Sequence, residues 1–491
     1  MAIESVPSPD RLFPADPSVR AIARDLYAQV RGLPIVSPHG HTDPAWFARN
    51  EAFSDPASLL IVPDHYVFRM LYSQGVALES LGIPRRDGTP VADDPRAIWR
   101  VFASHWHLFR GTPSRTWIAH ALHDVFGVRE RLTAESADRV YDRIATCLAK
   151  PEFLPRALFE RFNIEVLATT ESPLDGLVHH KALRASGWKG RVVTAFRPDP
   201  VVDPEHPDFA ANVSTLGELT GEDTHAWGGY LRALAGRRQF FASLGATSTD
   251  HGHPSAATFD LSRSECEALF RKAIAGDAGP DEAERFRGQM LTEMARMSLD
   301  DGLVMQIHPG ACRGHNLEVA RKFGPDKGAD IPTRTEYVRA LKPLLDKFGN
   351  DARLTLIVFT LDESTYSREL APMAGHYPAL KLGPAWWFFD SPQGMLRYRE
   401  QVTETAGFYN TVGFNDDTRA FLSIPARHDV ARRVDCGFLA RLVAEHLLDE
   451  DEAAQVATDL AYNLARRAYK LIGLEDVSPT PGGDRSDHPF H

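Results

Sequence analysis

The stretch GLPIVSPHGHTDP, residues 32–44, passes from a short apolar segment directly into two histidines that are separated by one residue. Its apolar part, LPIV, predicts a short buried strand that His39 and His41 follow. Alternate residues of an extended strand point to the same face, so the two imidazoles could reach one divalent ion. The alternative is that both histidines are ordinary polar residues of a loop.

Short apolar runs of the same kind recur along the chain, and helical patterns separate them. Continuous apolar strands that alternate with helices indicate a parallel sheet covered on both faces. The eight candidate strands lie in LPIV, NIEVLATTE, GRVVTAFRPD, LGATSTDHGH, DGLVMQIHPG, RLTLIVFTLDE, ALKLGPAWWF and NTVGFNDDTR. Eight such strands predict an α/β protein with a (β/α)8 TIM-like barrel. A doubly wound open sheet is the alternative, but no G-x-G-x-x-G follows any of these strands.

Helical patterns also occur before and after the first candidate strand. The segment PSVRAIARDLYAQVRGLP predicts an amphipathic helix that ends at Gly32 and Pro34. The region from about residue 55 to 162 is rich in helical patterns and predicts a helical insertion after the first strand. We expect one domain over residues 1–475 and a flexible tail, rich in Pro, Gly and charge, over residues 476–491.

Polar side chains follow most of the candidate strands. The carboxyl ends of barrel strands converge on one mouth, where the active sites of such proteins lie. The polar residues expected there are His39, His41, Thr169 to Glu171, Arg197, Asp199, Asp250, His308, Asp362 and Asp417.

A carboxylate partner for the first histidine pair follows the last candidate strand, where Asp416 and Asp417 lie in NTVGFNDDTRAF. The first and last strands of a closed barrel are neighbours, so such an aspartate would lie beside His39 and His41. An Asp-Asp turn or a helix N-cap would also account for these two residues. Two other H-x-H pairs compete for a metal, at residues 105–107 and 251–253.

The composition excludes several classes of protein. A net charge of −11 argues against a general nucleic-acid surface, which needs a basic footprint. No apolar run approaches the roughly 20 residues of a membrane span, so we expect no membrane partner. The first residues lack the basic and apolar regions of a signal peptide, and we expect a cytoplasmic protein. The four cysteines lie far apart, which argues against a cysteine-rich zinc site or a disulfide framework.

Several segments match the motifs of a known enzyme family, in the same order along nearly the whole chain. LPIVSPHGH resembles the opening LPI-x-D-x-H-C-H, DHYVFR resembles DHY-K-W-R, and TTESPLDGLVHHKAL is similar to TTDDP…HK. TAFRPD resembles TFRPD, STDHG resembles SDHG, and MQIHPGACRGHN resembles Q-x-H-x-G-x-x-R-x-x-N. FNDDTRAFLSIPARHDVARR resembles TDSR-x-F-L-S-Y-x-R-H-E. These motifs are those of the uronate isomerase (glucuronate isomerase) family, within the amidohydrolase superfamily of metal-dependent barrels.

The resemblance implies roles for individual residues. The implied metal ligands are His39, His41 and Asp417, and the implied ion is one divalent metal, for which we expect Zn²⁺. The implied catalytic residues are Tyr66, Asp417 and Arg419. The implied substrate-binding residues are Arg197, His308 and Asp250. The family has an Asp where this chain has Ser37 and a Cys where it has Gly40. Both changes spare the ligand positions but alter the residues that support them.

The activity implied by the resemblance is aldose–ketose isomerisation in hexuronate catabolism. It interconverts D-glucuronate with D-fructuronate, and D-galacturonate with D-tagaturonate, through a cis-enediol. A nearby cation that lowered the pKa of Tyr66 from about 10 would let this residue act as base or acid. The expected partner is a small hexuronate, and we expect a homo-oligomer.

Two other functions remain possible on the sequence alone. One is a hydrolase of the same superfamily that uses one metal and acts on a sugar-acid lactone or ester. Two-metal members carry a modified lysine after the fourth strand, and ATSTDHGH has no lysine. The other is a barrel that binds sugar acids without catalysis, which the presence of Tyr66, Asp417 and Arg419 disfavours.

Overall fold

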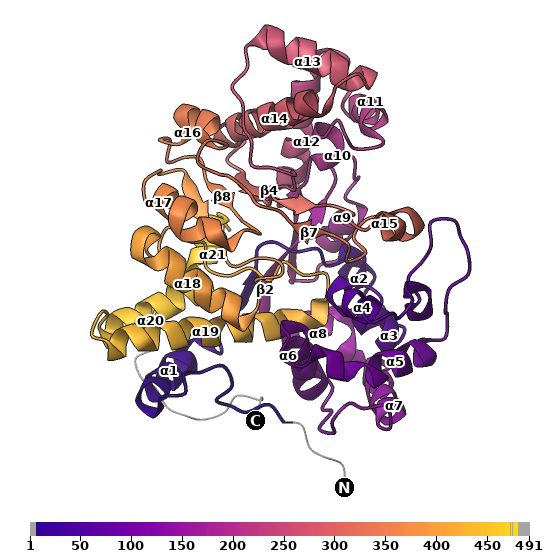
Figure 1. Ribbon diagram of the computed structural model, residues 1–491, viewed down its shortest axis with the longest axis vertical. Coiled ribbons are helices and arrows are strands. Elements are labelled where there is room, and N and C mark those ends of the chain that lie inside the picture. The colour runs from indigo at the N-terminus through magenta and orange to yellow at the C-terminus, as the bar shows by residue number, and fades with distance from the viewer. Residues whose placement is uncertain (1–5, 472, 474, 480–491) are drawn as a thin grey trace.

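A parallel sheet lies at the centre of the computed structural model, which describes residues 6–471, 473 and 475–479 (Figure 1). Seven strands pair in the order β1-β2-β3-β4-β5-β8-β9, and all of these pairings are parallel. The strands are β1 (Ile35–Ser37), β2 (Ile164–Glu171), β3 (Arg191–Phe196), β4 (Ser248–His251), β5 (Val304–Ile307), β8 (Leu356–Val358) and β9 (Leu380–Leu382). A neighbour order that follows the chain without reversal is that of a TIM-like barrel and not of a doubly wound sheet.

The eighth candidate strand is a correction to the sequence-based prediction. It is reduced to one parallel bridge between Thr411 and Leu382. Gly413 then turns into the left-handed region at φ +72°, and Asp417 lies there too at φ +39°. A regular strand cannot continue through such conformations. The barrel is still completed towards β1 at this point, because the backbone N–H of His41 donates to the carbonyl oxygen of Thr418 at 3.0 Å.

Two very short strands, β6 (Ala311–Cys312) and β7 (Ile331–Pro332), form a separate antiparallel pair after β5. No pattern in the sequence predicts these two strands, since two residues carry no readable alternation. The segment between them includes α15 and reaches the mouth of the barrel.

Between β1 and β2 the chain forms a group of helices that lies at the lower right of Figure 1. They are α2 (Pro44–Arg49), α3 (Pro56–Leu60), α4 (His65–Tyr72), α5 (Pro95–Ser104), α6 (Pro113–His120), α7 (Ala137–Leu148) and α8 (Pro155–Arg161). Asp-Pro pairs begin α2, α3 and α5, with the aspartate side chain capping the first backbone N–H groups and proline at the first helical position. Trp99 and Phe102 belong to the apolar cluster that joins these helices to β1 and β2.

The remaining helices precede, separate or follow the barrel strands. They are α1 (Pro17–Val30), α9 (Val178–Ala185), α10 (Asp199–Val202), α11 (Phe209–Thr220), α12 (Trp227–Ser243), α13 (Arg263–Ala275), α14 (Pro280–Asp301), α15 (Leu317–Phe323), α16 (Lys342–Phe348), α17 (Ala371–Ala374), α18 (Pro392–Ala406), α19 (Ile424–Ala444), α20 (Glu450–Thr458) and α21 (Leu464–Ala468). Helix α1 ends where Gly32 and Pro34 predicted, and it packs on α19 (Figure 1). Short 3-10 or π segments are η1 (Leu78–Leu81), η2 (Trp106–Phe109), η3 (Ala121–Val125), η4 (Pro151–Phe153), η5 (Glu363–Thr365), η6 (Tyr366–Leu370), η7 (Phe421–Ser423) and η8 (Asp459–Asn463).

The interior of the barrel is filled by apolar residues of successive strands. Val36, Val166, Val193, Val304 and Ile357 all belong to one buried cluster. Layers of branched side chains make such a barrel a packed core and not a pore. The predicted site residues of the strands lie at the carboxyl ends, above this layer, while Gln306 within β5 accepts a hydrogen bond from the Tyr469 hydroxyl at 2.7 Å.

Two predictions from the sequence concern membrane spans and domain boundaries. No helix among the described residues is long and apolar enough to cross a membrane. The division into one domain and a tail stays a prediction, and residues 480–491 of that tail lie outside the described residues.

A buried ion pair between two barrel helices gives a test of the packing. The guanidinium of Arg238 on α12 is 0% exposed, and its Nε donates to Asp301 Oδ2 on α14 at 2.6 Å. Asp301→Ala leaves this cation buried without its partner, and we expect a loss of about 3–5 kcal/mol in the free energy of unfolding. The control is Asp300→Ala on the same helix, whose side chain is 70% exposed and which should change stability by less than about 0.5 kcal/mol. Urea unfolding of both variants measures this, and similar losses would contradict the assignment.

A buried carboxyl at the end of β2 makes stability depend on pH. Burial raises the pKa of Glu171 from 4.5 to about 7 against hydrogen bonds from Thr169 and Thr194. The folded state therefore keeps this proton longer than the unfolded chain does. The resulting stabilisation is complete below pH 4.5 and is lost as pH rises through about 7.

Glu171→Gln removes this titration and isolates its contribution. We expect the stability of the wild type, relative to this variant, to fall by about 3 kcal/mol between pH 4 and 8. Unfolding free energies at a series of pH values measure the difference, and parallel profiles for the two proteins would refute the shift.

Candidate active site

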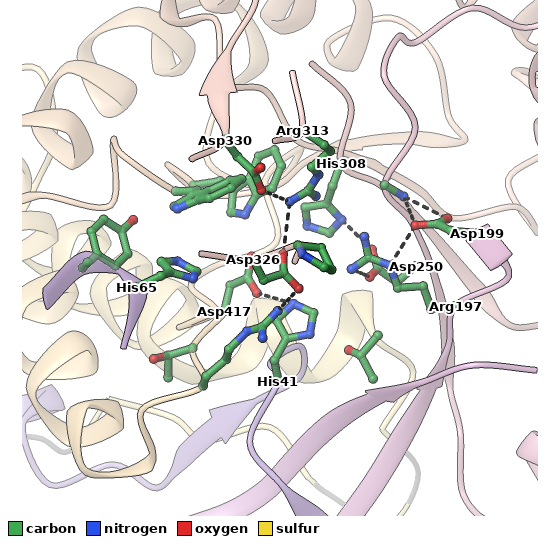
Figure 2. Close-up of a pocket in the computed structure, with 18 of the residues that line it drawn as sticks. His41, His65, Arg197, Asp199, Asp250, His308, Arg313, Asp326, Asp330 and Asp417 are labelled. Atoms are coloured by element: carbon green, nitrogen blue, oxygen red, sulfur yellow. Dashed lines mark hydrogen bonds and ion pairs between the residues drawn. The ribbon is translucent and has the colours of Figure 1, made fainter. Parts of the chain in front are cut away.

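The carboxyl ends of the strands open into a cavity of about 690 Å³ (Figure 2). All the site residues predicted from the sequence line this cavity: His39, His41, Tyr66, Arg197, Asp250, His308, Asp417 and Arg419. Thr170, Asp199 and Trp386 line it as well. Asp362, which was also expected at the mouth, instead caps η5 by accepting the backbone N–H of Ser364 at 3.1 Å.

Two histidines that follow β1, the first strand of the barrel, lie close to one carboxylate that follows its last strand segment. Asp417 Oδ1 lies 3.4 Å from His39 Nε2 and 3.1 Å from His41 Nε2. Burial raises the pKa of the Asp417 carboxyl, but the two imidazoles outweigh it and hold the pKa well below its usual value. Asp416 points elsewhere, with its Oδ2 3.1 Å from His428 Nε2. Of the two aspartates, the structure therefore brings Asp417 to the histidines.

Three groups of side chains among the described residues have ligand atoms close enough to share a metal ion. They are His39, His41 and Asp417; His39, Asp250 and His308; and Asp199, His251 and His253. Imidazole nitrogen and carboxylate oxygen are ligands that zinc and related ions accept. The pair at residues 105–107 belongs to none of these groups.

Of the three groups, the first contains the carboxylate with the fewest hydrogen bonds to other side chains. Asp250 already receives His308 Nδ1 at 2.7 Å and Arg197 Nη1 at 3.1 Å. Asp199 receives Arg197 Nε at 2.8 Å and the backbone N–H of Gly252. In contrast, Asp417 Oδ1 has contacts only with the two imidazoles that would share an ion with it, among the described residues.

A second network lies next to the histidine pair. The His308 ring stacks on His39 at 4.8 Å between centroids and on Phe359 at 4.0 Å. Burial lowers the pKa of His308 against the opposing effect of Asp250, so the ring is neutral near pH 7. Its Nε2 is buried and has no hydrogen-bond partner within the described part of the chain. Arg197 bridges Asp250 and Asp199 and thereby fixes this side of the cavity (Figure 2).

Tyr66 reaches the cavity from α4 in the segment between β1 and β2. Asp64 caps this helix by accepting the backbone N–H of Tyr66. The phenol O–H donates to Asp390 Oδ1 at 3.0 Å and accepts the backbone N–H of Phe388 at 2.9 Å. Arg427 Nη1 donates to the other oxygen of Asp390 at 2.6 Å.

The protonation of Tyr66 differs from the expectation that a nearby cation would lower its pKa. Burial and the charge of Asp390 raise the pKa of the phenol well above 10, and Arg427 opposes them only in part. At neutral pH this side chain is a proton donor and not a base. The nearby cation exists, but its charge is already neutralised by the carboxylate that lies between them.

The cavity is also lined by charged residues that were not predicted as site residues, among them Asp326, Arg313, Asp390 and Arg427. Arg419 Nη2 donates to Asp326 Oδ2 at 2.8 Å. Arg313 and Arg427 stand inside motifs that were recognised, MQIHPGACRGHN and FNDDTRAFLSIPARHDVARR, so the signal was available for them. Asp326 and Asp390 lie in loops outside those motifs, where an aspartate on its own predicts only a turn.

His65 also lines the cavity, next to Tyr66 on α4. Burial and the charge of Arg419 lower its pKa to about 3, so the ring is neutral at pH 7. No catalytic role was predicted for this residue from the sequence.

Comparison with known proteins places this geometry in one family. The family model described as glucuronate isomerase matches residues 18–469. A uronate isomerase of Xanthomonas axonopodis pv. citri (strain 306) is 69% identical over 463 residues, which are 94% of this chain and 98% of that protein. A uronate isomerase of Phenylobacterium zucineum (strain HLK1) is 68% identical, over 94% of this chain and 96% of that protein.

Solved structures agree with these sequence matches. The crystal structure of glucuronate isomerase from Caulobacter crescentus is 62% identical and covers 97% of this chain and 99% of its own, with a TM-score of 0.94. The uronate isomerase of Thermotoga maritima is 25% identical and covers 95% and 100%, with a TM-score of 0.88. The prediction of a TIM-like barrel of the amidohydrolase type is thereby confirmed. The chain belongs to the glucuronate isomerase family.

Proposed function

We propose that this protein is a uronate isomerase that interconverts D-glucuronate and D-fructuronate, and D-galacturonate and D-tagaturonate. This proposal rests on one observation: in a chain of this family, a single cavity contains a proton donor, two arginines and a His-His-Asp group. An aldose–ketose isomerase needs such groups, because it moves a proton between neighbouring carbons and stabilises an oxyanion between them.

We propose one Zn²⁺ ion per chain, held by His39, His41 and Asp417. The distances within this group and the lack of other commitments of Asp417 support the assignment. Such an ion supplies positive charge that orients a sugar acid or polarises one of its oxygens. Ser37, where the family has an aspartate, leaves its hydroxyl oxygen buried and without a partner among the described residues, so it gives the histidines no acidic support.

The chain's own residues serve the substrate's oxygen atoms, whose protons a cis-enediol route must add and remove. Tyr66 keeps its proton at neutral pH and donates it to an oxygen of the substrate. Asp417 is ionised and accepts the proton of a substrate hydroxyl group. The neutral His308 is oriented by Asp250 through its Nδ1, and its Nε2 can accept a hydrogen bond from a substrate hydroxyl group.

Binding the acid requires cations that face the same cavity. Arg419 and Arg197 both line it, and a guanidinium can bind two oxygens of a carboxylate or an enediolate. Arg197 is held by two aspartates, while Arg419 is the more exposed of the two, at 41% of its side chain. We propose that both arginines contact the substrate, with Asp250 and His308 binding its hydroxyl groups. The homo-oligomeric state and the cytoplasmic location stay predictions.

A hydrolase acting on a sugar-acid lactone or ester is not favoured. The uronate isomerase relatives cover nearly the whole chain at high identity, and no lysine follows β4 before His253. A two-metal centre bridged by a modified lysine has no residue to form it at this position.

The isomerase activity is tested by following D-glucuronate with the metal-replete protein in deuterated water by NMR. We expect D-fructuronate to form, and solvent deuterium at C1 would support the enediol route. Tyr66→Phe should lower kcat by on the order of a hundredfold or more, because it removes the donated proton. Tyr72→Phe, at the exposed end of the same helix, is the matched control and should match the wild type. Folded, metal-replete protein that converts neither glucuronate nor galacturonate would rule out the proposal.

The metal assignment is tested by metal content per chain. His39→Ala combined with His41→Ala should lose the ion, because two of its three proposed ligands are gone. His251→Ala should keep it, since this residue belongs to a different group. Inductively coupled plasma mass spectrometry measures both. Retention of metal by the double variant, or its loss from His251→Ala, would overturn the assignment.

A further inference from the structure

Arg419 depends on a segment that is not part of the barrel sheet. Its Nη2 donates to Asp326 Oδ2 at 2.8 Å, and Asp326 lies between β6 and β7. Figure 2 shows Asp326 in the middle of the cavity, between Arg313 and the group formed by His41 and Asp417. The catalytic arginine is thus anchored by a carboxylate about ninety residues away in the sequence.

Asp326 is itself held in place by a chain of alternating charges. Arg313 Nη1 lies 3.8 Å from Asp326 Oδ1 and donates to Asp330 Oδ2 at 2.9 Å. The other oxygen of Asp330 accepts the backbone N–H of Gly314 at 2.7 Å. The order of charges is therefore Asp330, Arg313, Asp326, Arg419, and it runs from the β6–β7 segment into the cavity. These contacts fix the position of the Asp326 carboxylate.

The backbone of this segment is shaped so that Asp326 reaches inward. Asp326 adopts φ +56°, a left-handed conformation that costs free energy for a residue other than glycine. Gly328, two residues on, has φ +72°, and a Cβ atom there would lie 2.6 Å from Arg69 Cβ of α4. The backbone N–H of Arg86 donates to the carbonyl of Lys322 at 2.8 Å. The segment is thus packed against the helices that follow β1, close to Tyr66.

The Asp326 carboxyl is ionised at neutral pH. Burial raises the pKa of its carboxyl, but Arg419, through its charge and hydrogen bond, and Arg313 hold that pKa below the usual range. The bond to Arg419 is therefore between two ions. It uses one of the five N–H donors of the guanidinium, which leaves a free edge for substrate oxygens.

We propose that Asp326 is a positioning residue for the isomerase reaction: it holds the Arg419 guanidinium at the cavity so that its free N–H groups meet the substrate's anionic oxygens. The inference rests on the proposed function for the meaning of Arg419. An arginine side chain has many rotamers, and Arg419 is 41% exposed, so without an anchor it samples many positions. Fixing it before substrate arrives removes the cost of ordering it from the reaction.

The turnover test compares two aspartates that share one partner. Asp326→Asn should lower kcat for D-glucuronate by on the order of tenfold or more with a smaller change in KM, because a misplaced group costs most in the transition state. Asp326→Glu keeps the charge and should recover part of the loss. Asp330→Asn removes an equal charge from the same Arg313 without touching Arg419, and should cost clearly less. Equal losses in Asp326→Asn and Asp330→Asn, or no loss in Asp326→Asn, would overturn the proposal.

A binding test separates this inference from the isomerase assignment. L-Gulonate is D-glucuronate with its aldehyde reduced to an alcohol, so it keeps the carboxylate and the hydroxyl configurations of the substrate, and D-glucitol is its uncharged counterpart. By calorimetry, Asp326→Asn should weaken L-gulonate binding about three- to tenfold, leave D-glucitol unchanged, and have no further effect in an Arg419→Ala background. Tighter L-gulonate binding would make Asp326 a competitor of the substrate instead, and an equal effect without Arg419 would make its role unrelated to that arginine. Protein that shows the expected binding pattern but converts no uronate would refute the proposed function alone.

Discussion

Asp417 contacts His39 and His41, and the rest of the site depends on this contact. It joins the end of β1 to the end of the barrel sequence, where the backbone N–H of His41 also donates to the carbonyl oxygen of Thr418. A carboxylate between two imidazoles thus lies at the seam of the barrel. The left-handed conformation of Asp417 aims its side chain at the histidines at the cost of a regular eighth strand.

The other groups are arranged around this seam by elements of different origin. His308 and Asp250 come from barrel strands and stand on a packed apolar layer, so their positions are set by the core. Tyr66 comes from a helix after β1, and Asp326 from the β6–β7 segment. The barrel therefore fixes the proposed metal ligands and substrate-binding groups, while the segments outside the sheet contribute the proposed proton donor and the anchor of Arg419.

Sequence reasoning reached the residues whose position follows from a strand. The histidines after LPIV, Arg197 after β3, Asp250 in β4 and His308 after β5 all face one cavity because parallel strands end at one edge. Tyr66 was reached through its motif, since nothing in a helical pattern says which neighbour a phenol will meet. Its protonation was out of reach, because the pKa depends on Asp390, which is 324 residues away in the sequence. Asp326 was missed for the same reason: ion pairs between loops leave no periodic trace. Which residues bind metal and substrate remains a proposal.

Four arginines of the cavity have a common property with a consequence for how the substrate arrives. Arg197, Arg313, Arg419 and Arg427 each already pair with an aspartate of the chain. These four cations are thus presented as dipolar ion pairs, on a protein whose net charge is −11. An anionic sugar feels little long-range attraction on approach, so electrostatic steering contributes little to its association rate. Recognition must come from short-range exchange of partners inside the cavity, where a sugar acid of the right shape replaces water at the free edges of guanidinium groups.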